Sequence, residues 1–377
     1  MSTQQMDFVL RLPSKIIFGP GKFNLLPEEV KSFTRSNKKI FLVMDPAVRQ
    51  KILSQIENLF SEYRTFPYAI PAGEPTVEAV DKSADLARKE NPALIIGIGG
   101  GSAMDTAKAV AGLVTNPGSS QNYRGQNLLR NPALPKIMVP TTAGTGSELT
   151  PTAVLIGQGK KGGINSPYLI PEVALLDPKL ILDLPPEVTA ATGLDALAHA
   201  IESFLSKNSS PFTEPLSLEA VRLLVEALPI AVDEGKNLEA RTKTLMGSLI
   251  AGITLANAGV IAGHSLSYPL GGRYQVSHGV ANGILLPYVI KELLDSATEK
   301  LSLLALALGI GKAKEVPDFL LSFERRLGFH KRMRDFGIPE GELENLVTEA
   351  QEIAVPLANT PKPLTKEDLV RIYQSAY

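Results

Sequence analysis

β-rich runs and helical stretches alternate along the first half of the chain. The β-rich runs cover residues 15–21, 38–45, 93–102 and 136–148, and helix-like segments such as 75–91 and 102–114 lie between them. A strand that returns through a helix pairs in parallel with its predecessor, and helices then cover the faces of the sheet. The first half of the chain therefore predicts an α/β domain with a Rossmann-like parallel sheet.

The pattern changes near Leu184. Strand-like runs stop there, Pro185-Pro186 marks a boundary, and long helical patterns ending in Pro, Asn or Gly follow. We expect an α/β domain over residues 1–183, an all-helical domain over residues 184–377, and a functional site in the cleft between them.

Composition excludes several classes of protein. Thirty-eight basic and 39 acidic side chains give a formal charge of −1, so nothing favours nucleic acid or an anionic membrane as a partner. The chain has no cysteine, which excludes disulfides, thiolate metal sites and cysteine nucleophiles. The N-terminal residues lack the long apolar core of a signal peptide. We expect a cytoplasmic protein that acts on a small molecule.

One apolar segment has about the length of a membrane span. It runs between Lys243 and Arg273 without an Asp, Glu, Lys or Arg. It contains Ser248, Thr254 and Asn257 and has no flanking aromatic belt. We expect a helix buried in the helical domain and no membrane partner.

A glycine run, Gly99-Gly100-Gly101-Ser102, lies where a buried strand meets the start of a helix. Glycines allow a backbone to approach a ligand closely, and a helix N-terminus offers free N–H groups and partial positive charge. These properties suit a pyrophosphate, although a tight strand–helix turn without a ligand gives the same pattern. The run differs from the usual dinucleotide fingerprint.

Hydroxyl groups and one carboxylate add to the cofactor hypothesis. A loop after a later strand carries hydroxyls that suit a phosphate or a nicotinamide amide, at Thr141, Thr142, Thr145 and Ser147. Asp45 ends an earlier strand, where a carboxylate can bind a ribose diol and repel a 2′-phosphate. Its alternative role is to cap the next helix. An ordinary polar loop remains the alternative for the hydroxyl cluster.

Two ionisable residues stand alone in the helical pattern of residues 188–201. They are Asp195 and His199, which are four apart and so share one face of a helix. A buried carboxylate is unfavourable unless it is paired or bound to a cation. A hydrogen-bonded Asp–His pair is the simpler alternative to a metal site.

His264 and His278 repeat this situation in apolar or glycine-rich surroundings. One carboxylate and three imidazoles suit Fe²⁺ or Zn²⁺ with coordination positions left open. We therefore predict a metal site from Asp195, His199, His264 and His278. The fourth histidine, His330, lies among basic residues and is expected at the surface.

Six segments together resemble the signatures of the iron-containing (group III) alcohol dehydrogenases, and they occur in the order typical of that family. The segments are GGGSAMDTAK (99–108), PTTAGTGSE (140–148), SPYLIPEVALLDP (166–178), GLDALAHAIE (193–202), GH (263–264) and HGVANGILLP (278–287). The resemblance implies a dinucleotide-binding domain followed by a helical metal-binding and substrate domain. It also implies the same four metal ligands.

By the same resemblance, the cofactor contacts are Asp45, Gly99, Gly100, Gly101, Ser102, Thr141, Thr142, Thr145, Ser147 and Lys161. Asp45 corresponds to the residue that favours NAD over NADP. Members of the family commonly form homodimers through an N-terminal strand such as residues 15–19.

Two positions depart from the family pattern. Tyr268 stands where many members carry a histidine four residues after the third ligand, and Arg273 stands where an aromatic residue is common. We consider Tyr268 either as part of a proton relay or as a packing residue against Pro269. Arg273 is a candidate partner for an acidic substrate.

The sequence thus predicts an NAD(H)- and metal-dependent dehydrogenase. It would interconvert a small primary alcohol and its aldehyde, or a related hydroxy acid and ketone, by hydride transfer assisted by Fe²⁺ or Zn²⁺. The alternatives are a lyase resembling dehydroquinate synthase, a metal-free reductase resembling maleylacetate reductase, and a non-catalytic nucleotide-binding module.

Overall fold

A computed structural model describes residues 7–329 and 331–377, so His330 lies outside the described residues. The chain divides into two compact units that are not contiguous in sequence. Of the described residues, the α/β unit comprises Leu12–Thr142 and Ser147–Ile181, and the helical unit comprises Leu182–Tyr377, Ala143–Gly146 and residues 7–11.

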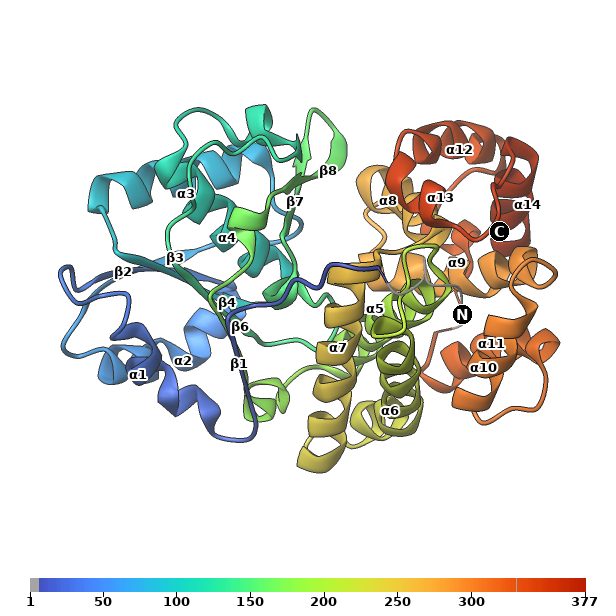
Figure 1. Cartoon of the computed structure of the whole chain (residues 1–377), viewed down its shortest axis with the longest axis horizontal. Helices are drawn as coiled ribbons and strands as arrows, with labels where there is room; N and C mark the ends of the chain where they lie inside the picture. The colour runs from blue at the N-terminus through green and yellow to red at the C-terminus, as the bar shows by residue number, and fades with distance from the viewer. Residues whose placement is uncertain (1–6, 330) are drawn as a thin grey trace. The chain divides into compact units, whose positions relative to one another are not determined.

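Six strands of the described chain form the central sheet of the α/β unit (Figure 1). The order across the sheet is β1-β9-β6-β4-β2-β3, and every neighbouring pair is parallel. The strands are β1 (Lys15–Phe18), β2 (Lys39–Met44), β3 (Arg64–Ala69), β4 (Leu94–Gly99), β6 (Lys136–Pro140) and β9 (Val173–Leu176). The predicted parallel sheet is confirmed.

Helices cover both faces of this sheet, and successive residues of each strand alternate between two apolar cores. Phe41 and Val43 of β2 pack with α3 (Val77–Glu90) and α4 (Gly101–Thr115) on one face. The residues between and beside them, Ile40, Leu42 and Met44, pack with α1 (Leu26–Val30) and α2 (Pro46–Leu59) on the other face. Burial on both faces explains why these strands read as nearly continuous apolar runs.

A second, smaller sheet lies after β6. It has the order β5-β8-β7, with β5 (Gly125–Gln126), β7 (Thr152–Gly157) and β8 (Lys160–Asn165). Strands β7 and β8 form an antiparallel hairpin. The sequence analysis did not predict this sheet, because β5 has only two residues and β8 is rich in lysine and glycine.

The helical unit is built around α5 (Pro186–Leu205), which packs against α6, α7 and α9. The other helices are α6 (Thr213–Asp233), α7 (Leu238–Ala258), α8 (Ala262–Tyr274), α9 (His278–Leu293), α10 (Thr298–Ala307), α11 (Val316–Arg326), α12 (Leu343–Gln351), α13 (Ala354–Asn359) and α14 (Lys366–Ala376). Pro186 occupies the first turn of α5, where its missing N–H has no intrahelical partner to lose. Nearly every residue of α5 from Gly193 onward is buried, so the helix can hold polar side chains away from water.

The apolar segment singled out in the sequence forms most of α7 and nearly all of α8, which are two helices where one was expected. Within residues 7–329 and 331–377, no single helix is both long enough and apolar enough to cross a membrane. Helices α7 and α8 reach the length and apolar composition of a membrane span only when they are considered together. The two helices are bent by 105° at their junction.

Candidate metal centre

Four side chains of the helical unit gather at one point. Helix α5 supplies Asp195 and His199, which lie one turn apart on the same face, as their spacing of four predicts. His264 comes from the first turn of α8, and His278 is the first residue of α9. One ligand atom from each of these four residues lies within 4.8 Å of the corresponding atoms of the others.

Close packing of α9 against α5 brings His278 to this cluster. A Cβ atom added at Gly279 would lie 2.0 Å from the carbonyl oxygen of Ala191 and 3.1 Å from the Asp195 Cβ. Only glycine therefore allows the start of α9 to approach α5 so closely. This close approach explains why Gly279 follows His278 in the sequence.

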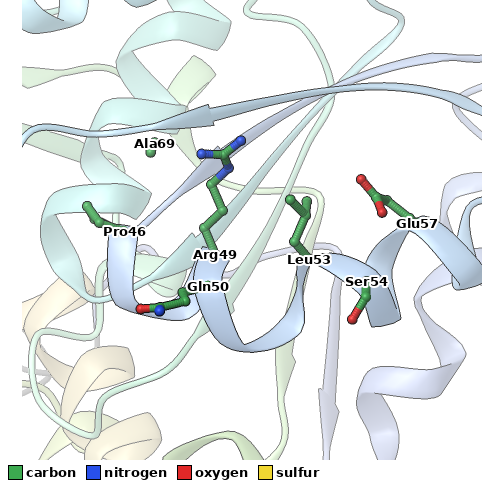
Figure 2. Close-up of a pocket in the computed structure, with 7 residues that line it drawn as sticks. All are labelled: Pro46, Arg49, Gln50, Leu53, Ser54, Glu57 and Ala69. Carbon is green, nitrogen blue, oxygen red and sulfur yellow. The ribbon is translucent and has the colours of Figure 1, made fainter.

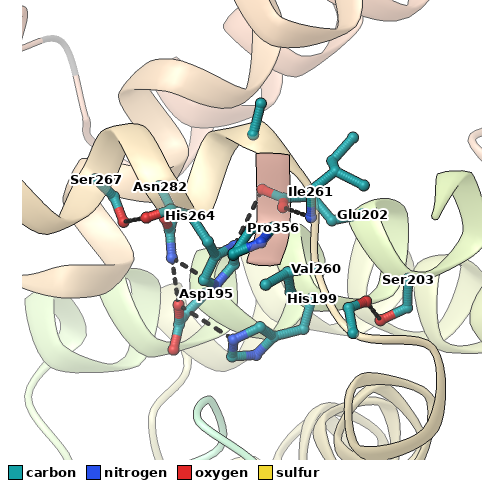
Figure 3. A network of polar contacts seen from close by, with 12 residues as sticks. Asp195, His199, Glu202, Ser203, Val260, Ile261, His264, Ser267, Asn282 and Pro356 are labelled. Carbon is teal, nitrogen blue, oxygen red and sulfur yellow. Dashed lines mark hydrogen bonds and ion pairs between the residues drawn. The ribbon is translucent and has the colours of Figure 1, made fainter. Parts of the chain in front are cut away.

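The Asp195 carboxylate faces Nε2 of His199 (Figure 3) and Nε2 of His278. Its Oδ1 lies 3.9 Å from Nε2 of His199 and 3.9 Å from Nε2 of His278. The amide nitrogen of Asn282 donates a hydrogen bond of 2.9 Å to the same Oδ1 and lies 3.1 Å from Nε2 of His264 and 3.3 Å from Nε2 of His278. Asn282 thus joins three of the four side chains.

The opposite ring nitrogens of two histidines face oxygen atoms outside the cluster. Nδ1 of His199 lies 3.3 Å from the carbonyl oxygen of Gly144, which is part of the helical unit. Nδ1 of His264 lies 3.1 Å from Oε1 of Glu202. In proteins that bind metals through histidine, the ring nitrogen that is not a ligand commonly has such an oxygen partner.

The pKa shifts of the clustered side chains favour protonation states that bind a cation. Burial alone would raise the pKa of Asp195, but the neighbouring His199, His278 and His264 and the Asn282 hydrogen bond lower this pKa to about 2. Burial lowers the pKa of His199, although Asp195 opposes the effect. The carboxylate is therefore ionised at neutral pH, and the lowered pKa of His199 favours a neutral imidazole, which is the form that binds metals.

The donor set and its spacing fit one divalent ion. Zn²⁺ bonds to imidazole nitrogen and carboxylate oxygen at about 2.0–2.2 Å, so its ligand atoms lie at most about 4.4 Å apart. The four atoms here, all within 4.8 Å of one another, need only a small contraction to reach that spacing. Asp195, His199 and His264 are buried, so the charge of this carboxylate has little access to water.

The residues predicted to bind a cofactor lie mainly at the carboxyl ends of three adjacent strands of the α/β unit. Asp45 follows β2, Gly99 ends β4, and Thr141 and Thr142 follow β6. Chain connections run in opposite directions from β2 and from β4, which makes their junction a topological switch point. Ligands of open parallel sheets bind at such points.

The turn between β4 and α4 leaves the N-terminus of α4 without a capping side chain. Gly100 precedes the helix and makes no side-chain cap. Gly99 adopts a φ of 154°, and a Cβ there would lie 2.7 Å from the Ala103 Cβ and 3.0 Å from the Asp45 Cβ. Asp45 itself accepts a hydrogen bond of 2.9 Å from the backbone N–H of Ala47 and caps α2. This is the alternative role considered from the sequence.

Other predicted cofactor residues have protein partners. The Ser147 hydroxyl donates to Oδ1 of Asp105 over 2.5 Å. The Lys161 ammonium forms an ion pair of 2.9 Å with Glu74. Thr145 belongs to the helical unit rather than to the α/β unit. The structure therefore brings together Asp45, residues 99–102, Thr141 and Thr142 within the α/β unit, and does not show a shared site for the remaining three.

The two residues that depart from the family pattern differ in their surroundings. The ring centroids of Tyr268 and His278 lie 5.6 Å apart, so Tyr268 borders the cluster. Arg273 forms ion pairs with Glu342 at 3.0 Å and Glu349 at 3.2 Å. The guanidinium that we considered for an acidic substrate is thus already paired with two carboxylates.

A surface groove of about 520 Å³ runs along the outer side of α2 (Figure 2). It is lined by Pro46, Arg49, Gln50, Leu53, Ser54, Glu57 and Ala69. None of the four clustered side chains lines this groove, so it is separate from the candidate metal centre.

Two residues of the centre were not predicted, namely Glu202 and Asn282. Glu202 follows His199 by three positions and Asp195 by seven, and Asn282 follows His278 by four. These spacings place each residue on the same helix face as a predicted ligand. Extending the face analysis by one turn would have found both.

Comparison with known proteins identifies the family. The profile described as "Iron-containing alcohol dehydrogenase" matches residues 13–178, and the profile described as "Fe-containing alcohol dehydrogenase family, C-terminal" matches residues 189–377. The chain belongs to the iron-containing alcohol dehydrogenase family. The resemblance inferred from the sequence signatures is confirmed, and membership favours a dehydrogenase over a lyase.

Similar members of the family cover nearly the whole length of the chain. Long-chain-alcohol dehydrogenase 1 of Geobacillus thermodenitrificans is 37% identical, with 97% of each chain covered. The structure of an alcohol dehydrogenase from Oenococcus oeni has a TM-score of 0.93 and 32% identity over 99% of this chain and 100% of that chain. The structure of sulfoacetaldehyde reductase from Bifidobacterium kashiwanohense in complex with NAD⁺ has a TM-score of 0.90 and 30% identity over 98% and 99%. The protein is an alcohol/aldehyde oxidoreductase of this family.

Proposed function

We propose that this oxidoreductase interconverts a small primary alcohol and its aldehyde, with NAD(H) as the hydride carrier and a divalent metal ion held by the helical unit. The observation that carries the proposal is the convergence of Asp195, His199, His264 and His278 at one buried point. A carboxylate buried beside three imidazoles is best explained by cation binding, because a buried charge is unfavourable without a partner.

The metal ligands in this proposal are Asp195 Oδ1 and the histidine ring nitrogens that face it. Fe²⁺ and Zn²⁺ both accept this donor set, and the family relationship favours Fe²⁺. When bound, such an ion supplies Lewis-acid polarisation of the substrate oxygen. The protein's contribution is to fix the imidazole orientation of His199 through the Gly144 carbonyl oxygen, and to exclude water from the buried side of the cluster.

The cofactor in this proposal is bound by the carboxyl ends of β2, β4 and β6. The uncapped N-terminus of α4 suits a pyrophosphate, because its N–H groups have no side-chain partner. Asp45 favours NAD over NADP, since its carboxylate repels a 2′-phosphate. The NAD⁺ complex of the related sulfoacetaldehyde reductase supports this choice. Thr145, Ser147 and Lys161 remain predicted contacts.

Tyr268 is the candidate for proton transfer near the substrate oxygen. Its ring lies beside His278, and a phenol can both donate and accept a proton. Packing against the ring of His278 is its alternative role.

We also propose that the protein forms a homodimer in the cytoplasm. Among the described residues, strand β1 is an edge strand that pairs only with β9, so its other side can pair with a second copy. Light scattering of the purified protein tests this part of the proposal, and a monomeric mass would contradict it.

Metal analysis combined with a substrate panel tests the central proposal. We expect about one Fe²⁺ or Zn²⁺ per chain, NADH formation with primary alcohols, and loss of both after chelation. Asp195→Asn should lose the metal and the activity together. Asp233→Asn is the matched control, because Asp233 forms a surface ion pair with Arg326. An active enzyme without any divalent ion would contradict the proposal and favour a metal-free reductase.

A further inference from the structure

The buried carboxylate of Glu202 has no role in the reaction described so far. Glu202 lies on α5, has 0% of its surface exposed, and faces the start of α8 rather than the solvent. We propose that Glu202 is a positioning residue that holds His264 in the tautomer and orientation required for metal binding. The inference rests on the proposed metal centre and deepens it.

The two oxygens of Glu202 have separate partners (Figure 3). Oε2 accepts a hydrogen bond of 2.6 Å from the backbone N–H of Ile261, the residue that precedes α8. Oε1 lies 3.1 Å from Nδ1 of His264. This is a hydrogen-bonding distance, although the alignment of the two groups falls outside that of a well-formed hydrogen bond. The Glu202 carboxylate thus anchors the start of α8 through one oxygen and faces the His264 side chain with the other.

The position of the Glu202 carboxylate selects between the two neutral forms of the imidazole. Its Oε1 faces Nδ1 as an acceptor, because Oε2 already accepts from the Ile261 N–H, and this favours the form of His264 with the proton on Nδ1. Nε2 then carries the free lone pair. That atom faces the cluster, since it lies 3.1 Å from the Asn282 amide that also binds Asp195. The ring is therefore held with its ligand atom toward the metal position.

Gly263 makes this arrangement sterically feasible. A Cβ atom at this position would lie 2.3 Å from Oε1 of Glu202. Any other residue would push the carboxylate away from His264. The glycine immediately before the third predicted ligand is thus explained by the approach of Glu202 and not by a turn, because it lies inside α8.

Glu202→Gln is the decisive variant because it preserves volume and reverses one hydrogen bond. The Ile261 N–H requires an oxygen acceptor, so the glutamine oxygen takes that place and the NH₂ group turns toward His264. The NH₂ group donates to Nδ1, which moves the imidazole proton to Nε2, the atom that must bind the metal. We expect metal binding to weaken by about 10- to 100-fold.

Two further variants separate this effect from general damage. Gly263→Ala displaces the carboxylate without changing a charge and should weaken metal binding in the same direction. Ser203→Ala is the matched control, since Ser203 is the buried neighbour of Glu202 on α5 and its hydroxyl donates to the Gly259 carbonyl oxygen over 3.0 Å. This hydrogen bond is made to Gly259 and not to His264, so the Ser203→Ala variant should bind metal as the wild type does.

Two measurements on the intact protein provide the readout. Competition with a chelating dye gives the affinity for Zn²⁺ and Co²⁺, and ¹⁵N–¹H correlation spectra of the imidazoles report the His264 tautomer in the metal-free protein. We expect the proton on Nδ1 in the wild type and on Nε2 in Glu202→Gln. Unfolding of the metal-free variants reports whether they fold.

The outcomes distinguish this inference from the proposed function. A wild type that binds no divalent ion overturns the metal centre itself. A wild type that binds the ion, together with a folded Glu202→Gln or Gly263→Ala variant that matches its affinity within twofold, overturns the role of Glu202 alone. An unchanged His264 tautomer in Glu202→Gln does the same without reference to the metal.

Discussion

Replacement of Glu148 by Gln should make the protein more stable at alkaline pH and leave it unchanged at acidic pH. Glu148 lies in the short 3₁₀ helix Ser147–Leu149 of the α/β unit and is only 2% exposed. Burial raises the pKa of its carboxyl from 4.5 to about 7, although a backbone hydrogen bond and the nearby Lys108 ammonium oppose the shift. The folded protein therefore prefers the protonated carboxyl.

The sign and magnitude of this effect follow from proton linkage. Below pH 4.5 the carboxyl is protonated in both states and does not alter the free energy of unfolding. As pH rises toward 7, the unfolded chain ionises first and stability falls. The interval from 4.5 to about 7 corresponds to about 3 kcal/mol, because one pKa unit is worth about 1.4 kcal/mol. Glutamine mimics the protonated form and removes this loss.

Urea unfolding of the metal-free protein at a series of pH values between 5 and 8 measures the effect. The free energy of unfolding of Glu148→Gln minus that of the wild type should grow by about 2–3 kcal/mol across this range. Titrating groups that do not interact with Glu148 are common to both proteins and cancel in the difference. A difference that stays constant with pH would refute the assignment of a raised pKa to Glu148.

Three further substitutions test the surroundings of the metal centre. Tyr268→Phe should keep the metal content and shift the pH profile of kcat; an identical profile removes the phenol from proton transfer. Arg273→Ala should leave KM unchanged for neutral and acidic substrates, because Glu342 and Glu349 already pair with the guanidinium, and should lower stability by about 1 kcal/mol or less; a raised KM for acidic substrates alone would contradict this. Asn282→Ala should destabilise the metal-free protein by about 1.5–3 kcal/mol in unfolding experiments, since Asp195 loses a buried hydrogen bond to a charged group, and equal stability of the two proteins would argue against it.

Sequence patterns predicted the elements whose packing leaves a regular signature. Strands β2 and β4 are buried on both faces, and their continuous apolar runs stood out clearly. The spacing of Asp195 and His199 placed them together, because a helix fixes which residues share a face. That His264 and His278 join this pair was predicted only from the small number of histidines in the chain and from the family resemblance. Nothing in the local sequence specifies how α8 and α9 pack on α5.

Other elements left weak or ambiguous signals. Strand β3 contains Pro67 and is only partly buried, so its residues do not read as a core strand. Arg273 and Ser147 showed a different limit. Each residue type suits a ligand, but the structure gives each a protein partner from a distant part of the sequence, Glu349 and Asp105. Such pairings depend on tertiary packing, which spacing along the chain does not report.

The short loop Ala143–Gly146 has a practical consequence for dissecting the enzyme. It interrupts the α/β unit in sequence yet belongs to the helical unit, where its Gly144 carbonyl oxygen faces the imidazole of His199. A recombinant fragment that starts at Leu182 would lack this segment and leave that ring nitrogen without its acceptor. Gene fusions or split versions of this protein therefore need both pieces of chain, because no single cut yields a complete ligand-bearing half.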